Sequence, residues 1–436
     1  MRPVLLAFLL LAWCDTAARA QDTPPILLTP DEAIARAMAH SQRLAEAQAR
    51  EAGAQAAVES RRAAERPSLA VSTGYTRTNH VDEFGVPQPN GTLRVIYPDI
   101  PDNYFTRATL QWPIYTAGRT DALVRASEAE ARAVAAETRV ARADLRLEVV
   151  RAYWALVTAT ESVRVFEEGL TRADTHLSDV RSRFDNGLIP PNEVSSVEAE
   201  RARQQMHLIE ARNLRSSVLE DLRRLTGITA DITVQRLSGS AGGPRPDGAP
   251  ENPRRPEQDA LRARVAAADE RVSAVRAGRR PTVAFNAAAD YANPNQRIFP
   301  RADLWRTSWE VGVVATWPLW DGGRVAAESA EAAAAARALR ARQADMDAVI
   351  AAEIRQRRLD LDSAHAVLDA ADVAVSSATE ARRIVTERFN VGVATSTDVL
   401  DAQVVLLQAE LDRTRALANI RLAEARLDRA AGVEGH

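Results

Sequence analysis

Side chains that commonly perform catalysis or bind metals are few in this chain, and their spacing does not combine them. The six histidines are scattered along the chain, so we expect solvated surface histidines rather than a metal or catalytic pair. Nucleophile elbows, phosphate-binding loops, dinucleotide fingerprints and zinc-ligand spacings are also missing from the sequence. We therefore predict no enzyme, no catalytic residue, no cofactor and no metal site. The histidines are His40, His80, His176, His207, His365 and His436.

Composition favours long helices over a thick globular core. The chain has 436 residues, alanine is abundant, and aromatic residues make up only 5% of the sequence. The formal net charge is -3 at pH 7, which gives no reason to expect nucleic acid as a partner.

The N-terminal residues 1–20 have the features of a secretory signal peptide. Arg2 supplies a positive charge, an apolar run follows, and residues 18–20 form a cleavage site with small residues. Cleavage after residue 20 removes Cys14, the only cysteine, and lipid attachment to Cys14 is the open alternative. Elsewhere the sequence has no apolar run long enough for a membrane helix.

Two pairs of alternating segments predict β-strands with one apolar and one polar face. In the first segment, Leu69, Val71 and Tyr75 fall on one face, and small or polar residues fall on the other. Strands of about ten residues with aromatic ends are typical of an outer-membrane barrel, and a soluble hairpin with one buried face is the alternative. The predicted strands are 68–79, 104–115, 282–291 and 305–320, and the predicted aromatic belt comprises Tyr75, Trp112, Trp305, Trp309 and Trp317.

Each strand pair leads into a long predicted helix, a turn and a returning helix. From Leu145 to Phe184, apolar residues recur at alternating steps of four and three, which is coiled-coil spacing. Gly187 and Gly392 are expected to end the two long helices, because glycine adopts the left-handed cap conformation at little cost. The predicted long helices are 117–186, 192–226, 322–391 and 397–431, and one helix is expected before each strand pair, the first over residues 29–65.

The second half of the chain repeats the first. The Trp-Pro at 112–113 recurs at 317–318, and the Arg-Phe at 183–184 recurs at 388–389, both after a shift of 205 residues. A duplication of this length predicts two similar copies packed side by side. The predicted organisation is a signal peptide over 1–20, a first repeat over 21–227, a Gly- and Pro-rich linker or equatorial region over 228–256, a second repeat over 257–432 and a tail over 433–436.

Strands in lipid must pair all of their backbone N–H and C=O groups, so only closed barrels are stable there. The four strands of one chain cannot close, and the eight strands of two chains give a barrel filled by its own side chains. Three chains give twelve strands, the smallest multiple expected to leave a pore. If the strands cross a membrane, closure therefore favours a homotrimer with a shared barrel and a cylinder of helices below it.

The order of the motifs resembles that of the TolC family of outer-membrane efflux proteins over nearly the whole chain after the predicted signal peptide. These motifs include Leu-Thr-Pro-Asp-Glu-Ala-Ile at 28–34 and the Arg-Pro before each first strand. They also include the Trp-Pro run into Gly-Arg, Arg-Phe-x-x-Gly at each turn, and Asp-Val-Leu-Asp-Ala-Gln at 398–403. Each motif is weak alone, but their duplicated order is specific.

The resemblance implies a passive trimeric channel in the cell outer membrane of a Gram-negative bacterium, extending into the periplasm. The implied fold class is mostly α with transmembrane β: coiled-coil hairpins form an α-barrel, and four strands per chain contribute to a shared 12-stranded β-barrel. The implied partners are two further copies, a periplasmic adaptor, an inner-membrane pump of the resistance-nodulation-division or ABC type, and outer-membrane lipid. The channel is expected to serve tripartite efflux or type I secretion without a ligand pocket of its own.

The resemblance also implies a pore constriction made by acidic residues on the returning helices. Asp398 and Asp401 match the constriction aspartates of the family, and Glu193 is the first-repeat counterpart of Asp398. A ring of carboxylates favours cations and resists anions. The alternative is that Asp398, with Thr397, only caps its helix and that Asp401 is a solvated helix residue.

The glycine turns are implied to contact the adaptor, although a turn needs its glycine in any case. The best-known members of the family hold this end closed with a Tyr and an Arg. Phe389 and Ala394 stand at those positions, so the same hydrogen-bonded lock is not expected. The implied contact residues are Gly187, Leu188, Gly392 and Val393.

Two other classes of protein also contain long coiled-coil hairpins. A periplasmic adaptor has one hairpin inserted in a lipoyl-like β domain, whereas this chain has two hairpins. A structural coiled-coil interaction protein does not explain tryptophan-edged strands at equivalent places in both repeats. The sequence does not identify the transported substrate or the class of pump.

Overall fold

The computed structural model of the protein describes residues 26–235 and 254–433, which divide into two compact units. The predicted signal peptide, including Cys14, and most of the predicted linker lie outside the described residues. The sheet unit contains residues 41–148, 254–370 and 419–433, and the tip unit contains residues 26–40, 149–235 and 371–418.

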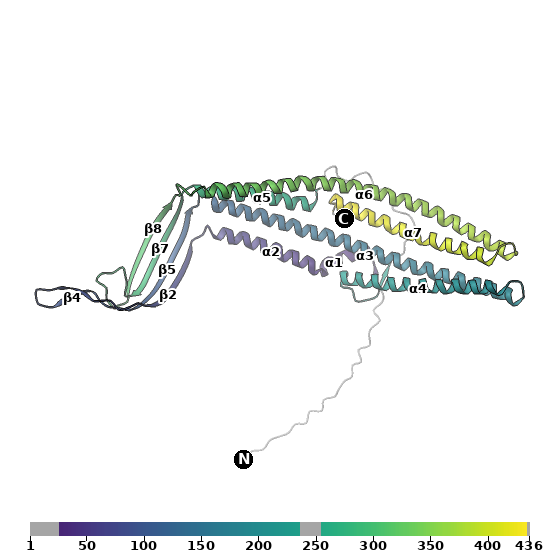
Figure 1. Ribbon diagram of the computed structural model, residues 1–436, viewed down its shortest axis with the longest axis horizontal. Helices are drawn as coiled ribbons and strands as arrows, with labels where there is room; N and C mark the ends of the chain where they lie inside the picture. The colour runs from purple at the N-terminus through teal and green to yellow at the C-terminus, as the bar shows by residue number, and fades with distance from the viewer. Residues whose placement is uncertain (1–25, 236–253, 434–436) are drawn as a thin grey trace, which may run out of the picture. The chain divides into compact units, whose positions relative to one another are not determined.

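The sheet unit contains one four-stranded antiparallel sheet with the order β2 (Ser68–Arg77), β5 (Asp102–Tyr115), β7 (Thr282–Asn293) and β8 (Arg306–Thr316). Figure 1 shows these strands side by side. The first repeat contributes β2 and β5, the second contributes β7 and β8, and the two repeats join through the pairing of β5 with β7. Strands β2 and β8 are the two edges.

One face of this sheet is apolar across all four strands, because the alternation keeps its register between the repeats. Leu69 of β2 pairs with Leu110 of β5. Leu69 and Trp309 are 70% and 75% exposed, so the described part of the chain leaves this face uncovered. Two successive rows across the sheet are Leu69, Leu110, Ala287 and Val311, and Val71, Ala108, Ala289 and Trp309.

The opposite face carries polar and charged side chains that bind one another. Arg107 Nη2 donates a hydrogen bond to Glu310 Oε1 at 2.6 Å, and Arg107 Nε lies 3.6 Å from Asp290 Oδ1. Arg297, in the loop after β7, also pairs with Glu310. The sheet therefore has the two different faces that the period-two pattern predicts.

The connection from β2 to β5 contains structure that the sequence analysis did not predict. The predicted strands 68–79 and 104–115 leave residues 80–103 as a connection without strands, but β3 (Phe84–Pro87) and β4 (Leu93–Tyr97) form a short antiparallel hairpin within it. Gly91 in its turn has φ +80°, which glycine adopts without steric cost. An Asn-Gly pair between short alternating runs is a recognised hairpin signal, and it is present at 90–91.

Strand β8 ends at Thr316, earlier than the predicted end at residue 320. Pro318 follows shortly, and proline lacks the N–H that a strand needs to continue its ladder. Trp317 therefore lies just beyond the strand, where its Nε1 donates a hydrogen bond to Arg279 O at 3.3 Å.

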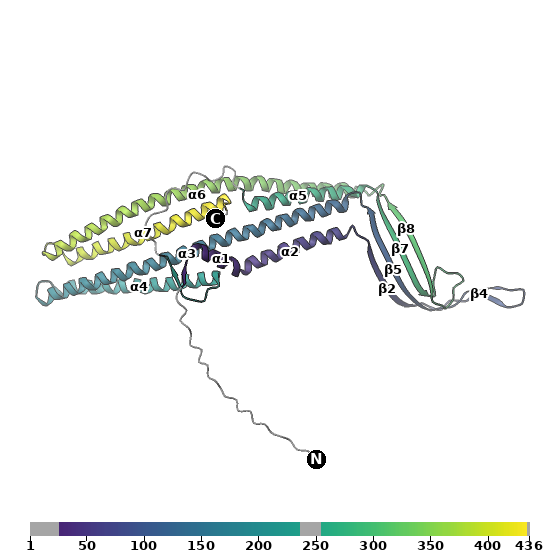
Figure 2. The same ribbon diagram turned by 180° about the vertical axis from the view of Figure 1, so that it is seen from behind.

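Helices of both repeats pack beside one another in the sheet unit. Figure 2 shows α2 (Gln42–Ala63) beside α3 (Arg119–Asp185), and α5 (Pro256–Arg276) beside α6 (Arg324–Asn390). Ion pairs link these helices, including Arg43 with Glu148 at 2.6 Å and Arg139 with Asp259 at 3.2 Å.

The helix predicted over 29–65 is divided in two at Ser41. Helix α1 (Pro30–His40) ends there, and Ser41 takes an extended conformation. The Ser41 hydroxyl accepts a hydrogen bond from the N–H of Leu44 at 3.2 Å, so this serine caps α2 instead of continuing α1.

The tip unit contains a short parallel strand pair that the sequence analysis missed. β1 (Ile26–Leu28) pairs with β6 (Ile232–Val234), which lies within the predicted irregular linker. Tyr153, only 1% exposed, donates a hydrogen bond from its hydroxyl to Leu28 O at 3.1 Å and fastens this pair to α3.

The long helices have the same length in both repeats. Helices α3 and α6 each have 67 residues, and α4 (Pro191–Thr226) and α7 (Ser396–Ala431) each have 36. The predicted apolar stripe is buried over most of its length, but its last residue differs: Phe184 is 41% exposed and Phe389 is 3% exposed. Within residues 26–235 and 254–433, no helix is both long enough and apolar enough to cross a membrane.

Candidate functional site

Both long helices end in the same hydrogen-bonded turn. Gly187 has φ +73°, and its N–H donates to Phe184 O at 2.8 Å. The N–H of Leu188 donates to Arg183 O at 2.9 Å, which completes a Schellman cap. The second repeat forms the same cap around Gly392, at φ +77°. The two predicted turn glycines therefore have the conformation that requires glycine.

The two turns expose the side chains that follow each glycine. Leu188 is 73% exposed and Val393 is 66% exposed. A side chain added at either glycine would meet open space, since nothing lies within 4 Å of that position. Figure 1 shows both turns at the same end of the tip unit. The exposed Leu188 and Val393 give each turn a small apolar surface.

Asp398 forms part of the cap that starts α7. Thr395 Oγ1 accepts a hydrogen bond from the N–H of Asp398 at 3.2 Å. Asp398 Oδ2 in turn accepts bonds from the N–H and the hydroxyl of Thr395, both at 2.8 Å. Thr395 is therefore the capping residue and the assignment of this role to Thr397 was wrong, because α7 begins at Ser396.

The same two hydrogen bonds affect the charge of Asp398. The backbone N–H of Thr395, and then its hydroxyl, hold the pKa of this carboxyl below its usual value. Asp398 therefore stays ionised under more acidic conditions than an ordinary aspartate, and its exposed position leaves the charge open to solvent.

The other two predicted constriction residues occupy related positions. Asp401 lies one turn after Asp398 on the exposed side of α7. Glu193 has the position in α4 that Asp398 has in α7, but Pro190 replaces the capping threonine, so no capping box forms. Asp398 and Asp401 are thus adjacent on one helix, and Glu193 belongs to the other hairpin.

A buried core holds the two hairpins together near their turns. Phe389 lies in this core, so an apolar contact takes the place of the phenol hydrogen bond that the resemblance would imply. Ala394 packs at the edge of the core. The buried members are Leu177, Val180, Val197, Phe389, Val399 and Leu400.

Arg183 of the first repeat closes this core over Phe389 of the second. Its guanidinium carbon lies 4.1 Å from the centre of the Phe389 ring, a cation–π contact. Arg183 Nη1 donates to Phe389 O at 2.8 Å, and Nη2 donates to Asn390 Oδ1 at 3.2 Å. The sequence analysis noted the Arg-Phe motif but did not foresee this contact.

His176 is buried beside the same phenylalanine, so the expectation that all histidines are solvated was wrong for this residue. It is 5% exposed, and its Nε2 lies 2.9 Å from Ser396 Oγ. Its ring meets the Phe389 ring edge-on, with 5.2 Å between the ring centres. Burial lowers the pKa of the imidazole; Asp179 acts in the opposite direction and Arg183 in the same direction.

We expect the buried imidazole of His176 to make stability fall in acid. Its folded-state pKa lies below the ordinary value of 6.5, so the unfolded chain binds the proton more readily. Stability should therefore be full above pH 6.5 and decrease as the pH falls through it. The measurement is the thermal unfolding midpoint at pH 7.5 and 5.5. His176→Gln, which keeps a hydrogen-bonding group but does not titrate, should lose less; equal losses would contradict the prediction.

Of the predicted aromatic residues, Tyr75, Trp112 and Trp309 lie on the apolar face of the sheet, and Trp305 and Trp317 flank the two ends of β8. Near one end, the ring centres of Tyr75 and Tyr104 lie 5.0 Å apart, and those of Tyr104 and Trp305 lie 6.0 Å apart. Trp112 and Trp317 lie toward the other end, whereas Trp309 lies between the two groups. Tyr104 and Trp112 are separated by about 27 Å along β5, or about 21 Å after a barrel-like tilt, close to the height of an apolar membrane band.

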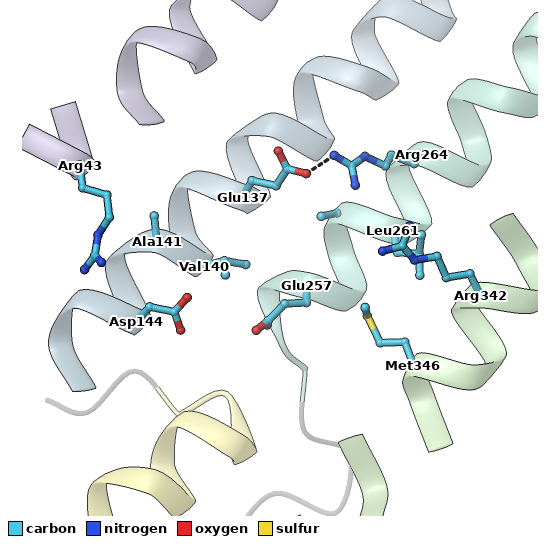
Figure 3. Close-up of a pocket in the computed structure, with 11 residues that line it drawn as sticks. Arg43, Glu137, Val140, Ala141, Asp144, Glu257, Leu261, Arg264, Arg342 and Met346 are labelled. Carbon is cyan, nitrogen blue, oxygen red and sulfur yellow. Dashed lines mark hydrogen bonds and ion pairs between the residues drawn. The ribbon is translucent and has the colours of Figure 1, made fainter. Parts of the chain in front are cut away.

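A cavity of about 340 Å³ lies among α2, α3, α5 and α6 of the sheet unit (Figure 3), although no ligand pocket was expected. Its carboxylates are already bound to arginines: Glu137 pairs with Arg264, and Asp144 and Glu257 both pair with Arg429. These pairs hold neighbouring helices together and engage each of the carboxylates that line the cavity. Within the described ranges, no group of histidines, cysteines or acids is placed to hold a metal ion.

The comparisons with known proteins give this geometry a family. The sequence model described as outer membrane efflux protein matches residues 33–228 and 253–433, which is most of the chain and both repeats. The chain belongs to the outer membrane efflux protein family. This efflux protein is 22% identical over 316 residues to the outer membrane protein TolC of Vibrio cholerae serotype O1, covering 70% of this chain and 72% of that protein.

Solved structures share the fold of this outer membrane efflux protein. VceC from Vibrio cholerae superimposes with a TM-score of 0.78 at 22% identity, covering 92% of this chain and 96% of that one. The CmeC channel of Campylobacter jejuni gives a TM-score of 0.77 at 16% identity, covering 92% and 85%. CusC gives 0.79 at 15% identity, covering 92% of both chains. The predicted TolC-like fold class, mostly α with an internal repeat, is confirmed.

Membership also confirms the localisation that the sequence analysis predicted for this efflux protein. It is a protein of the cell outer membrane of a Gram-negative bacterium, extending into the periplasm. The alternatives of a periplasmic adaptor and of a structural coiled-coil protein do not account for a family match that covers both repeats.

Proposed function

We propose that three copies of this chain form a passive outer-membrane duct that works with a periplasmic adaptor and an inner-membrane pump. The observation that carries the proposal is the four-stranded sheet with an uncovered apolar face and two open edges. In lipid the backbone groups of β2 and β8 need partners, and β8 of one copy can pair with β2 of the next. Three copies give a closed barrel of twelve strands, wide enough to leave a passage.

Acidic side chains at the helical end of this duct are well suited to narrow the passage and to select which ions pass through it. Three copies place six carboxylates around one axis, three from Asp398 and three from Asp401, with Glu193 on the alternate hairpins. The lowered pKa of Asp398 keeps its charge in place across the physiological range. Carboxylate rings attract cations and repel anions, so this constriction would favour cations.

The exposed turns are well suited to a partner at the periplasmic end. Gly187, Leu188, Gly392 and Val393 give each copy two similar apolar turns, six in the trimer. Regular, repeated turns of this kind can seat a ring of adaptor hairpins. The proposed duct carries substrates of a tripartite efflux or type I secretion system outward, and the energy comes from a resistance-nodulation-division or ABC pump.

The test is the native mass and the planar-bilayer conductance of one detergent-purified preparation. We expect a trimer with small, cation-selective openings that multivalent cations block. A non-conducting monomer that stays in solution without detergent would overturn the proposal, because the open sheet edges would then have no role in a membrane.

A further inference from the structure

The internal repeat allows contacts within one chain to be carried over to contacts between chains. In a closed ring of three copies, the first repeat packs against the second within a chain, and the second packs against the first of the next chain. A contact between residue x of the first repeat and y of the second therefore recurs between x+205 and y−205 of the neighbour. This step rests on the proposed trimer, and the shift of 205 residues holds throughout the long helices.

Within one chain, the contact at the turns is Arg183 on Phe389, with a second hydrogen bond to Asn390. The shift converts these three residues into Arg388, Phe184 and Asp185. The ring and the guanidinium are therefore kept in the carried-over contact, and only the third residue changes, from an amide to a carboxylate.

These three counterparts have no matching contact inside their own chain. Phe184 is 41% exposed, whereas its repeat partner Phe389 is 3% exposed. Arg388 and Asp185 are both exposed, and neither has an ion pair among residues 26–235 and 254–433. The charge of Arg388 contributes the smallest of the effects that lower the pKa of Asp398. The phenylalanine at this position of the repeat is thus buried in the second repeat and exposed in the first.

We propose that Arg388 of each copy binds Phe184 and Asp185 of the neighbouring copy, and that this contact holds the chain-to-chain seam closed at the turns. The occupant of the uncovered Phe184 surface is thus a second copy of this chain. The guanidinium covers the ring as Arg183 covers Phe389, and it bonds the Asp185 carboxylate where Arg183 bonds an amide. An arginine–carboxylate ion pair, in which both partners are charged, is stronger than the bond from arginine to an amide that it replaces.

The rest of the carried-over seam is weaker than its counterpart within the chain. The buried pair of His176 and Ser396 becomes Ala381 and Pro191, which cannot form that hydrogen bond. The ion pair of Arg172 with Glu410, 3.0 Å long, becomes Ser377 and Gln205. The Arg388 contact is therefore the main polar contact between chains near the turns. Because the other contacts are weaker, the seam between chains opens before the seam within a chain.

The first test is cysteine crosslinking in a Cys14→Ser background. Because an arginine side chain separates the two backbones by more than the roughly 7 Å that a disulfide spans, the two thiols are joined with a short bis-maleimide. Asp185→Cys with Arg388→Cys should then join neighbouring chains and give a covalent trimer on a denaturing gel. The matched control pair, Arg183→Cys with Asn390→Cys, occupies the counterpart positions and should crosslink within one chain, as peptide mass mapping would show.

The native mass of the same samples separates the possible failures. A trimer in which only the control pair crosslinks would overturn the seam contact and leave the proposed duct intact. A monomer would overturn the duct and the seam contact together. A trimer whose Phe184 surface becomes protected only when an adaptor is added would also overturn the contact, by assigning that surface to a different protein.

A charge exchange tests the same contact without a covalent bond. Arg388→Asp should raise the open probability in planar bilayers several-fold, because two carboxylates then face each other at each seam. Adding Asp185→Arg to that variant should restore the original open probability. A double variant as open as the single one would overturn the pairing of these two residues.

Discussion

Removing both charges at the start of α7, with Asp398→Asn and Asp401→Asn together, is expected to weaken block of the channel by a trivalent cation at least about tenfold, a change of about 1.4 kcal/mol. Three copies of the double variant lose six carboxylates around one axis, and even a solvated unit-charge pair at 4 Å is worth about 1 kcal/mol. Asparagine keeps an acceptor for the bonds from Thr395, so the cap at the start of α7 is retained. The measurement is the concentration of trivalent cation that halves the conductance.

A matched control separates this local effect from a change in overall charge. Asp412→Asn removes a carboxylate from the exposed surface of the same helix, farther from the turn, where Asp412 binds Gln408 and Arg415. This variant should leave the cation block unchanged. Unchanged block in the double variant as well would remove Asp398 and Asp401 from the constriction and leave Asp398 with its capping role alone.

Replacing Gly392 with valine is expected to abolish most export while the trimer stays assembled. Gly392 has φ +77°, a conformation that costs an L-residue about 1–2 kcal/mol, and more for a β-branched one. The new side chain meets no other atom, so the damage should be confined to the shape of the turn. Export of a dye substrate in cells, with native mass in detergent, measures both parts of the prediction.

The control for Gly392 is a glycine with the same backbone conformation in a turn that is not proposed to contact the adaptor. Gly91, in the β3–β4 turn, has φ +80° and likewise has open space around it. Gly91→Val imposes a similar strain but should leave export close to normal. Normal export in the Gly392 variant would mean that the turn does not dock tightly on a partner.

The parts of the fold that the sequence predicted well depend on local periodicity. The four long helices were placed to within two residues at each end, because apolar steps of three and four and a terminal glycine define a helix and its cap. The strand pairs followed from the period of two, and their register across four strands followed from the same alternation in both repeats.

The features that the sequence analysis missed depend on competition between two local conformations or on partners that are far away in the sequence. Ser41 could continue a helix or cap the next one, and Thr395 with Asp398 fits a capping box that was assigned instead to Thr397. Strand β6 is too short to show a period and exists because Ile26–Leu28 pairs with it. Burial of His176 depends on residues about 220 positions away in the chain.

The candidate site was only partly readable for a related reason. Phe184 and Phe389 stand in the same motif, yet one is exposed and the other is buried by the second hairpin of its own chain. A pattern along the sequence cannot distinguish two positions whose environments differ only in which neighbour covers them. Glu193 and Asp398, by contrast, could have been told apart, because Pro190 stands where Thr395 forms the capping box.

The identical helix lengths of the two repeats limit how this gene can diverge. One added residue would turn everything beyond it by about 100°, and the buried stripe would leave its partner. Insertions and deletions are therefore tolerated only in the connections, and the β3–β4 hairpin is such an insertion, since residues 294–305 between β7 and β8 contain no strand. Where a foreign epitope has to be carried by this chain, that hairpin is the place that can accept it.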